Sequence, residues 1–577
     1  MFVQKDAFPG QDTEVRPAPS EIPGPAPVRE QAAREIRLDS RETVQTPTAV
    51  VFLTEDRAYK LRRAVNHGFV DHRSRRARLI ACEDEVRLNR RLAPDVYLGV
   101  ADIRDETGAL RDHMVVMRRL PADRRLSALM TADVSGELRG LAQRLVAFHE
   151  GCETTPESTR TGGLCALEAL WLEAMDGLAP FRGRILDAAT VDEIGRLALR
   201  YLTGRGPLLA ERQAAGRIRD GHGDLLADDI YCLNDGPRVL NCVDVDPALR
   251  AGDVLGDAAS LAMDLERLGN ATAARTFLDA YREFSGETHP TSLEDLYIAY
   301  RAVVRAKTAC VRDHQGDPAA ADEARRLTDI ALRHLRRGRP RLVLVGGLPG
   351  TGKSTLASHL VSGEDDWVLL SSAAVRGEPV GAGATAPESD STSASASDSA
   401  GTEPAAGCYG ADATEHSYVE VLTRARHALE RGRSVVIDAS WSSRRVRARA
   451  AELAAECDAD LMQLRCVVPP RVAVARIADR ATVPIALGST ADRSGPVHST
   501  ATRSAPAGVV PIGRAPIGAV AGGATTGHRA DPANALAPDE WIYLDMATRT
   551  DPWPDAHDID TSAPVEHAVT AAHLLIN

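Results

Sequence analysis

The sequence has few aromatic residues, which make up 4% of its 577 positions, so aliphatic side chains must fill its cores. Hydrophobic residues still amount to 44%, which is enough for well-packed interiors. The chain exceeds the size of one ordinary domain, and we expect two or three. The nine cysteines include no C-x-x-C pair, which argues against a zinc site or a disulfide framework and favours reduced thiols.

Long apolar runs are also missing. No run approaches the roughly 18 residues that a membrane-spanning helix needs, and the first residues do not resemble a secretory signal. The formal net charge of −12 argues against a protein that coats nucleic acid, although a local basic groove remains possible. We therefore expect a soluble cytoplasmic protein with no membrane partner and with nucleic acid as a disfavoured partner.

One stretch carries the strongest chemical signal. Residues 341–355 read RLVLVGGLPGTGKST, a short apolar strand followed by the spacing G-x-x-x-x-G-K-[ST] at Gly347, Gly352, Lys353 and Ser354. Such a loop turns backbone N–H groups around a phosphate, places a lysine on the β and γ oxygens, and offers a hydroxyl to Mg²⁺. The spacing predicts binding of a nucleoside triphosphate, ATP with Mg²⁺, rather than a chance glycine-rich turn. The candidate binding residues of this loop are Gly347, Gly350, Thr351, Gly352, Lys353, Ser354 and Thr355.

Composition divides the rest of the chain. Residues 1–40 are rich in proline and poor in large apolar side chains, which predicts a disordered tail. Two further stretches, 376–407 and about 482–535, have low complexity or few order-forming residues and are predicted insertions. A basic R-R-G-R-P hinge then separates a domain at 41–337 from a domain at 338–577.

The first domain opens with strand-like and helical patterns. The segment AVVFLTEDRAYKLRRAV predicts two strands with Lys60 on the second, and ACEDEVRLNRRLA predicts a helix that carries Glu85. Two more strand-like runs follow. In a kinase small lobe a strand lysine contacts the phosphates and a helix glutamate holds that lysine. The alternative is that Lys60 is a solvated residue of an edge strand.

A second motif lies further along this domain, where DGHGDLLADDIYCL precedes a turn and the segment VLNCVDVDP. Phosphoryl transfer needs a loop aspartate to accept a proton and two further ligands to hold Mg²⁺. Asp224 fits the first place, and Asp229 and Asp244 fit the other two, with Asp246 as a possible substitute for Asp244. The alternative is a set of acidic turn residues.

HGDLLADDI resembles the H-G-D-x-x-x-x-N loop of the aminoglycoside phosphotransferase and choline kinase-like superfamily, and VDVD is similar to the metal-binding segment of that group. The resemblance extends over roughly residues 43–334 and strengthens the roles given to Lys60 and Glu85. It implies that Asp257 steadies the catalytic loop through its backbone. One position departs from the pattern: the asparagine of the superfamily is Asp229 here, which adds negative charge beside the phosphates.

A later helix of this domain, YIAYRAVVRAKTACVR, places Arg301 and Arg305 one turn apart, with Lys307 off that line. These cations form either a solvated helix face or a wall of the acceptor pocket that recognises anions. His149, at the end of an earlier amphipathic helix, is predicted to be a packing or capping residue.

In the second domain strands alternate with helices, which implies a parallel sheet covered on both faces. This half resembles the small AAA-like P-loop kinases, such as gluconate kinase, zeta toxin and polynucleotide kinase relatives. The resemblance implies an arginine lid at Arg476 and Arg480. It also places Ala373 where those relatives carry a proton-accepting aspartate, so activity there is weak or Asp438 serves instead.

The two halves in this order resemble a class of fused bacterial proteins. We expect a protein-kinase-like, bilobal α+β domain followed by an α/β P-loop NTPase with a parallel sheet. The predicted function is ATP-dependent transfer of the γ-phosphoryl group to a hydroxyl of a small polar acceptor, such as a sugar or an aminoglycoside-like molecule. Two alternatives stay open: a regulatory protein whose P-loop half switches without useful turnover, and a polynucleotide 5′-kinase. The acceptor and the oligomeric state do not follow from the sequence.

Overall fold

The structure is a computed structural model, and it describes residues 42–46, 48–66, 71–364, 366–377, 411–481 and 538–576. The predicted tail, the second insertion and all but two residues of the first insertion lie outside these ranges. The chain divides into two compact units. Unit 1 comprises Met1–Leu199, Leu209–His289 and Leu293–Arg336, and unit 2 comprises Arg200–Leu208, Pro290–Ser292 and Arg337–Asn577.

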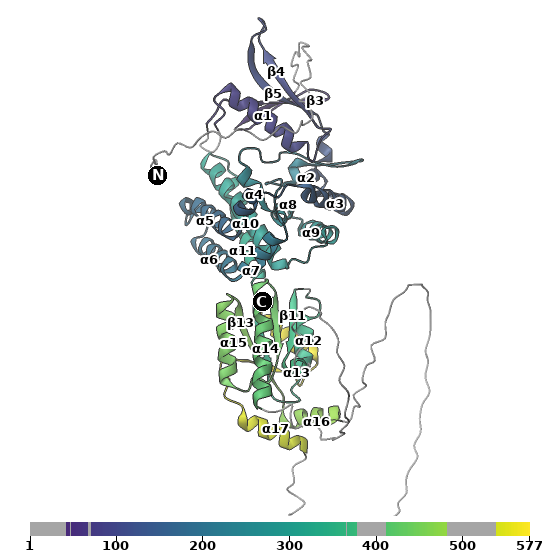
Figure 1. Ribbon diagram of the computed structural model, residues 1–577, viewed down its shortest axis with the longest axis vertical. Helices are drawn as coiled ribbons and strands as arrows, with labels where there is room; N and C mark the ends of the chain where they lie inside the picture. The colour runs from purple at the N-terminus through teal and green to yellow at the C-terminus, as the bar shows by residue number, and fades with distance from the viewer. Residues whose placement is uncertain are drawn as a thin grey trace, which may run out of the picture. The chain divides into compact units, whose positions relative to one another are not determined.

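Unit 1 begins with a five-stranded antiparallel sheet in the order β1-β2-β3-β5-β4 (Figure 1). Its strands are β1 (Glu42–Gln45), β2 (Ala49–Leu53), β3 (Arg57–Arg62), β4 (Tyr97–Arg104) and β5 (Leu110–Arg118). Helix α1 (Arg75–Asn89), capped by the Ser74 side chain, packs on this sheet, because Cys82 and Val86 share a buried cluster with Val115 and Met117. The predicted pattern of two strands, a helix and two strands is present.

The rest of unit 1 is mainly helical. Its longer helices are α3 (Ser135–Gly151), α5 (Leu164–Leu178), α6 (Ala188–Gly204), α7 (Gly206–Ala214), α8 (Val254–Arg267), α9 (Ala271–Ser285), α10 (Thr291–His314) and α11 (Ala320–Arg337). Short helices α2 (Leu126–Leu129) and α4 (Pro156–Thr161) accompany them. Two small antiparallel sheets, β6 (Ile218–Asp220) with β9 (Ala251–Asp253) and β7 (Ile230–Leu233) with β8 (Gly236–Val239), carry the loops of the predicted site.

Helix α8 forms the centre of this helical part. Every residue from Val254 to Leu265 is buried, and the side chain of Asp253 caps the first turn by accepting a hydrogen bond from the Leu255 N–H. A helix buried on all sides provides a rigid support, and the loop between β6 and η3 (Ala227–Asp229) contacts its polar residues.

Unit 2 contains a five-stranded sheet in the order β11-β12-β10-β13-β14, and all its neighbouring strands are parallel. The strands are β10 (Arg341–Gly346), β11 (Trp367–Ser371), β12 (Ser434–Asp438), β13 (Asp460–Val467) and β14 (His557–Asp560). The order reverses at β10, whose neighbours β12 and β13 both come later in the chain. This places the loop after β10 at a topological switch point, where α/β sheets bind their ligands.

Helices cover both faces of the unit 2 sheet, as its alternating strand residues require (Figure 1). Leu342 and Leu344 face the cluster formed with α14 (Ala411–Glu430) and α15 (Arg444–Glu456). Val343 and Val345 face the opposite cluster. The helices of that second face are α12 (Lys353–Val361) and α18 (Val565–Ile576).

Three further helices lie in the described part of unit 2: α13 (Ser372–Gly377), α16 (Pro470–Ala481) and α17 (Pro538–Arg549). The sequence analysis did not predict α17, which directly follows the second predicted insertion. Its first residue is a proline, whose fixed φ and missing N–H suit the start of a helix. The eight cysteines in the described ranges are free thiols. Across the same ranges, no helix has the length and apolarity needed to cross a membrane.

Candidate functional sites

The predicted Lys60–Glu85 pair is formed in unit 1. The Lys60 Nζ on β3 lies 2.7 Å from Glu85 Oε1 on α1, and Glu85 is 2% exposed. Burial opposes ionisation of this carboxyl, but the charges of Lys60 and Arg62 outweigh burial and lower the pKa of Glu85. The lysine is therefore fixed in position on the sheet and is not a solvated edge residue.

Arg62 is a site residue that the sequence analysis missed. It lies two positions after Lys60, so both side chains leave the same face of β3. One of its guanidinium nitrogens lies 2.6 Å from Glu85 Oε2 and also pairs with Asp244 Oδ2. Burial works against the positive charge of Arg62, yet the two carboxylates keep its pKa above the ordinary value. The two-residue spacing from Lys60 was the available signal.

Asp244, not Asp246, belongs to this network. The side chain of Asp246 caps a short 3₁₀ turn by accepting a hydrogen bond of 2.8 Å from the Ala248 N–H. The side chain of Asp244 is 14% exposed and turns toward Arg62. The contacts of the two aspartates therefore differ, and Asp244 is the one that pairs with the Lys60–Glu85–Arg62 group.

The loop that carries Asp224 is held by α8. Asp257 accepts hydrogen bonds from the backbone N–H groups of His222 at 2.6 Å and Gly223 at 2.9 Å, which is the contact implied by the resemblance. His149 lies 3.3 Å from the same carboxylate and 2.8 Å from the Tyr281 hydroxyl. His149 is therefore a buried packing residue, as predicted, and the loop backbone is fixed.

His222 is itself part of the support for this loop. Its side chain is fully buried, and burial lowers its pKa, which keeps the imidazole neutral. Its Nε2 lies 2.9 Å from the carbonyl oxygen of Leu240, and its Nδ1 accepts the Asp224 N–H at 3.4 Å. Two hydrogen bonds of opposite direction define one tautomer, so His222 shapes the loop instead of transferring protons.

Helix α10 places its two arginines differently. Arg301 donates to the carbonyl oxygens of Gly223 at 2.5 Å and Gly256 at 3.2 Å. Arg305, one turn later, has its Nη1 3.7 Å from Asp224 Oδ2. The guanidinium of Arg301 is therefore bound to the backbone of the loop, and that of Arg305 lies beside the carboxylate of Asp224.

Asp229 is the position where the sequence departs from the superfamily pattern. Burial raises the pKa of its carboxyl to about 7, and the nearby charges of Asp224 and Asp228 act in the same direction. The Asn241 side-chain amide donates a hydrogen bond to it and only partly opposes this shift. The extra negative charge expected at this position is thus present for only part of the molecules near neutral pH.

The described residues contain no group of three or more His, Cys, Asp or Glu side chains arranged to hold a metal ion. Asp229 and Asp244 are nevertheless of the right kind for Mg²⁺, which proteins commonly bind through one or two carboxylates together with phosphate oxygens and water. The donor set in unit 1 therefore fits a metal held jointly with a nucleotide, and not a dedicated all-protein cage.

The P-loop of unit 2 has the local geometry that its motif predicts. Gly350 has φ +76°, and a Cβ there would lie 2.3 Å from the carbonyl oxygen of Ala473, so no larger residue fits. Lys353 Nζ donates to the Leu348 carbonyl oxygen at 3.0 Å, and Thr351 Oγ1 donates to the same oxygen at 2.7 Å. The loop is closed on itself around the start of α12.

Asp438 lies at the end of β12, beside the P-loop. Its Oδ2 accepts a hydrogen bond of 2.7 Å from the hydroxyl of Ser354. A strand-end carboxylate beside the P-loop serine supports the metal in P-loop NTPases. Asp438 thus belongs to the nucleotide end of the site.

Arg476 reaches the other side of the same loop. Its Nη2 donates to the Thr561 carbonyl oxygen at 2.9 Å, and Thr561 Oγ1 donates to the Thr351 carbonyl oxygen at 2.6 Å. Ala373 is exposed near the start of α13. The side chain of Arg480 lies outside the described residues.

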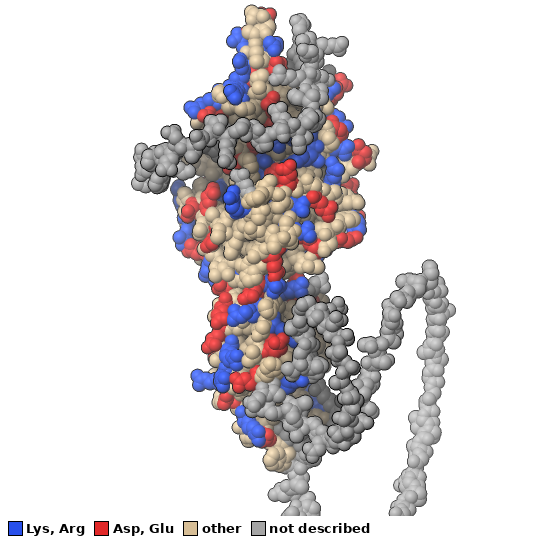
Figure 2. All heavy atoms as spheres, viewed as in Figure 1, with Lys and Arg blue, Asp and Glu red and all other residues tan. Residues whose placement is uncertain are grey.

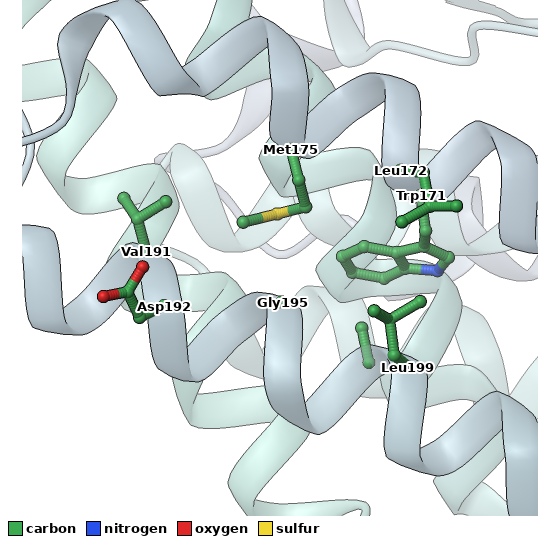
Figure 3. A pocket seen from close by; sticks show the side chains of 8 residues that line it. Trp171, Leu172, Met175, Val191, Asp192, Gly195 and Leu199 are labelled. Atoms are coloured by element: carbon green, nitrogen blue, oxygen red, sulfur yellow. The ribbon is translucent and has the colours of Figure 1, made fainter.

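A separate cavity of about 170 Å³ lies between α5 and α6 (Figure 3). Figure 3 shows Met175 and Trp171 from α5 above Gly195 and Leu199 of α6. Its lining is apolar except for Asp192, and it contains none of the predicted site residues. This cavity is therefore not the place where the predicted chemistry occurs.

Comparison with known proteins identifies a domain family in the second half of the chain and relatives that match most of the chain. Residues 342–491 match the AAA domain family. An uncharacterized protein of Mycobacterium tuberculosis H37Rv is 38% identical over 449 residues, which cover 77% of this chain and 86% of the relative. An uncharacterized protein of Mycobacterium bovis matches to the same extent.

Solved structures similar to this chain include the complex of APH(2″)-IIIa with GDP and kanamycin, with a TM-score of 0.35 and 15% identity over 51% of this chain and 93% of that chain. A choline/ethanolamine kinase family protein from Mesorhizobium loti has a TM-score of 0.33 and 18% identity over 51% and 90% of the two chains. The Pnkp1/Rnl/Hen1 RNA repair complex has a TM-score of 0.19 and 24% identity over 25% and 38%.

The fold and the two sites define a two-part protein, in which a protein-kinase-like α+β unit precedes an AAA-type α/β P-loop unit. Unit 1 has the strand lysine paired with a helix glutamate and the supported H-G-D loop of kinase-like folds. The chain belongs to the same family as the two mycobacterial proteins, given the identity and the coverage of both chains.

Proposed function

We propose that unit 1 is an ATP-dependent phosphotransferase that acts on a hydroxyl of a small polar acceptor. The observation that carries this proposal is the fixed loop of Asp224, which Asp257 holds by two backbone hydrogen bonds. This loop is linked to the Lys60–Glu85 pair through Arg62, which contacts both Glu85 and Asp244. Phosphoryl transfer depends mostly on positioning and electrostatic stabilisation, and both require groups that are held before the substrate arrives.

In this reaction the acceptor hydroxyl gives its proton to the carboxylate of Asp224. The hydroxyl oxygen forms a bond to the γ-phosphorus of ATP, and the bond from that phosphorus to the β–γ bridging oxygen breaks, which releases ADP. Lys60, held by Glu85, contacts the α and β phosphates. Arg301 keeps the backbone at Gly223 in place, and therefore positions Asp224 without touching the substrate.

Asp229 and Asp244 are the residues that would hold Mg²⁺ with the phosphates in unit 1. When bound, this ion neutralises negative charge that develops on the transferred group. Since Asp244 is already paired with Arg62, one of its two oxygens remains for the metal. Asp229 must lose its proton before it can act as a ligand.

For unit 2 we propose ATP and Mg²⁺ binding through the P-loop, with Lys353 on the phosphates and Ser354 and Asp438 on the metal side. Asp438 is reassigned here from proton acceptor to metal support, because its carboxylate is paired with Ser354. With Ala373 at the position of the usual base, unit 2 contributes less to turnover than unit 1. A regulatory, nucleotide-binding role of this unit fits the same observations.

A polynucleotide 5′-kinase is less well supported. Figure 2 shows Lys and Arg interspersed with Asp and Glu over the described surface in that view, and the whole chain carries a net charge of −12. A basic strip that follows a phosphate backbone would make affinity fall steeply with salt. We expect acceptor phosphorylation to show no such steep salt dependence.

The experiment that tests the proposal compares two variants of the full chain with labelled ATP and a panel of sugars, aminoglycosides and nucleic-acid ends. Asp224→Asn keeps the shape of the side chain but removes the base, so we expect phosphorylation to fall by about 10²–10⁴-fold. ATP binding and thermal stability should stay near wild type. Lys353→Ala should leave the same activity within a few-fold.

The comparison of these two variants tests which unit is the enzyme. If Lys353→Ala abolishes turnover and Asp224→Asn does not, unit 2 is the enzyme and unit 1 is the binding module. Asp235→Asn is the control, because that carboxylate is 68% exposed and pairs with Arg238 at the turn between β7 and β8. It should retain full activity.

A further inference from the structure

Arg305 stands out among the cations of the unit 1 site because no residue in the described ranges accepts a hydrogen bond from its guanidinium. Its contact to Asp224 is an ion pair at 3.7 Å, too long for a hydrogen bond. Arg301, one turn earlier, donates to two backbone carbonyl oxygens, and Arg62 is buried against two carboxylates. Arg305 therefore carries charge and donors that remain available to a ligand.

Both members of this pair reach solvent. The side chain of Asp224 is 40% exposed and that of Arg305 is 28% exposed, so an incoming molecule can contact the two at once. Arg305 comes from α10, which also supports the catalytic loop through Arg301. The cation is thus held by the same helix that positions the aspartate.

We propose that Arg305 makes the site selective for an acceptor that carries a carboxylate or phosphate close to the hydroxyl that reacts. This inference rests on the proposed function of Asp224 as the proton acceptor. It replaces the aminoglycoside-like acceptor of the sequence analysis with an anionic hydroxy compound, such as a sugar acid, a hydroxy acid or a sugar phosphate.

The charge arrangement gives the physical reason. An anionic acceptor that approaches Asp224 meets like charge, and a guanidinium beside that carboxylate compensates it and forms charge-assisted hydrogen bonds to the acceptor. A cationic acceptor gains from Asp224 but is repelled by Arg305, and a neutral acceptor gains from neither charge. The arginine therefore favours one charge class over the other two.

Distance limits the shape of the acceptor. The reacting hydroxyl must come within about 3 Å of Asp224, and an anionic oxygen binds a guanidinium at about 2.8 Å. With 3.7 Å between the two side chains, the hydroxyl and the anionic group lie no more than roughly 9.5 Å apart. Both groups therefore belong to one small molecule or to one end of a larger one.

Two matched series of hydroxyl compounds test this inference. The first is glycerate, glycerol and serinol, and the second is glucuronate, glucose and glucosamine, each ordered from anion through neutral compound to cation. Binding is measured by saturation-transfer NMR on the full chain with a non-hydrolysable ATP analogue and Mg²⁺. The chain carries Lys353→Ala, so that the P-loop does not contribute anion binding.

We expect the anion of each series to bind best. Arg305→Gln should weaken its binding by about ten- to a hundredfold and leave the neutral compound unchanged. Arg305→Glu should reverse the order and favour the cations. Arg312→Gln is the control on the same helix, because its guanidinium is occupied by Asp317 and Glu323, and it should keep the wild-type order.

Two results would overturn the inference. One is that the protein with the native Arg305 does not bind the anion of each series best. The other is that Arg305→Gln weakens the binding of all three compounds of a series equally. The second result would make Arg305 a group that only adjusts Asp224. These binding measurements do not need turnover. The proposed function fails separately, if Asp224→Asn keeps full phosphorylation of whichever acceptor is used.

Discussion

At the scale of single residues, the site of unit 1 is a set of shared charges. Glu85 binds Lys60 and Arg62 with its two oxygens, and Arg62 forms a second ion pair with Asp244. Each buried ion thus has a partner of opposite sign, which is the condition under which buried charge is tolerated. Removal of one member leaves the others uncompensated.

Arg62→Met should therefore be strongly destabilising, because methionine keeps most of the apolar volume but leaves the carboxylate of Asp244 without its cationic partner. We expect a loss of about 3–5 kcal/mol in the free energy of unfolding. Arg57→Gln on the same strand is the control, since Arg57 is 41% exposed, and should change stability by about 0.5 kcal/mol or less. Urea unfolding of both variants measures the difference. Equal midpoints for the two would show that the Arg62 network contributes nothing.

Asp229 gives a pH-dependent prediction. Its pKa is raised from 3.8 in the unfolded chain to about 7 in the fold, so its contribution to stability is complete below pH 3.8. That contribution is lost as the pH rises toward 7, because the folded protein must then hold a desolvated charge. Asp229→Asn should consequently raise the melting temperature at pH 8 relative to wild type.

The same variant should have little effect on the melting temperature near pH 4, where the wild-type carboxyl is protonated in the fold. Thermal unfolding at pH 4, 6 and 8 follows the difference. A gain that is largest at low pH would contradict the raised pKa of Asp229.

At the scale of elements, function depends on a few supports. Helix α8 holds the catalytic loop through Asp257, α10 holds it through Arg301, and α1 brings Glu85 to β3. In unit 2 the corresponding support is the contact of the P-loop with α16. The glycines of that loop let its backbone approach neighbouring backbone closely.

Gly350→Ala tests this close approach. The new Cβ would lie 2.3 Å from the Ala473 carbonyl oxygen, so either the loop or α16 must move. We expect at least a tenfold loss of ATP-analogue affinity in unit 2. Gly363→Ala is the matched control, because Gly363 also has positive φ (+86°) but faces open space.

Isothermal titration calorimetry measures the affinity of both variants for the ATP analogue. Thermal unfolding measures their stability. Gly363→Ala should lower the free energy of unfolding by about 1–2 kcal/mol, because alanine is strained in a left-handed backbone conformation. Its nucleotide affinity should not change. If Gly350→Ala binds as wild type does, the packing of the P-loop against α16 is unimportant for the site.

At the scale of the whole molecule, two units with different folds each contain residues suited to nucleotide phosphates. The clear P-loop motif lies in the unit that lacks a proton acceptor at Ala373. The complete set of transfer groups that we propose lies in unit 1, whose motif is less conspicuous. The clearest sequence motif and the proposed catalytic site therefore lie in different halves of the chain.

We predict two nucleotide sites per chain. Titration of the full protein with a non-hydrolysable ATP analogue and Mg²⁺ should give a stoichiometry near two. Lys60→Ala and Lys353→Ala should each reduce it to one, since each removes charge-assisted hydrogen bonds worth about 1.5–3 kcal/mol. The double variant should bind none. A stoichiometry of one in wild type, abolished by either single change, would refute two separate sites.

The sequence by itself determined the features that depend on neighbouring residues. A P-loop is made by consecutive backbone groups, and strands and helices follow from periodicity, so residues 341–355 and the order of elements could be predicted. The motif around Asp224 was recognisable for the same reason. The identity of the helix that supports this loop followed only from a family resemblance.

Only the tertiary structure decided the roles that depend on distant partners. Arg62 and Asp244 are 182 positions apart, and no local pattern indicates that they meet. The same holds for Asp438, which joins Ser354 across parallel strands, and for the different fates of Arg301 and Arg305. Side chains one helical turn apart look equivalent in sequence. In the fold, Arg301 donates to the backbone of the loop, whereas Arg305 is the residue that we propose binds a ligand.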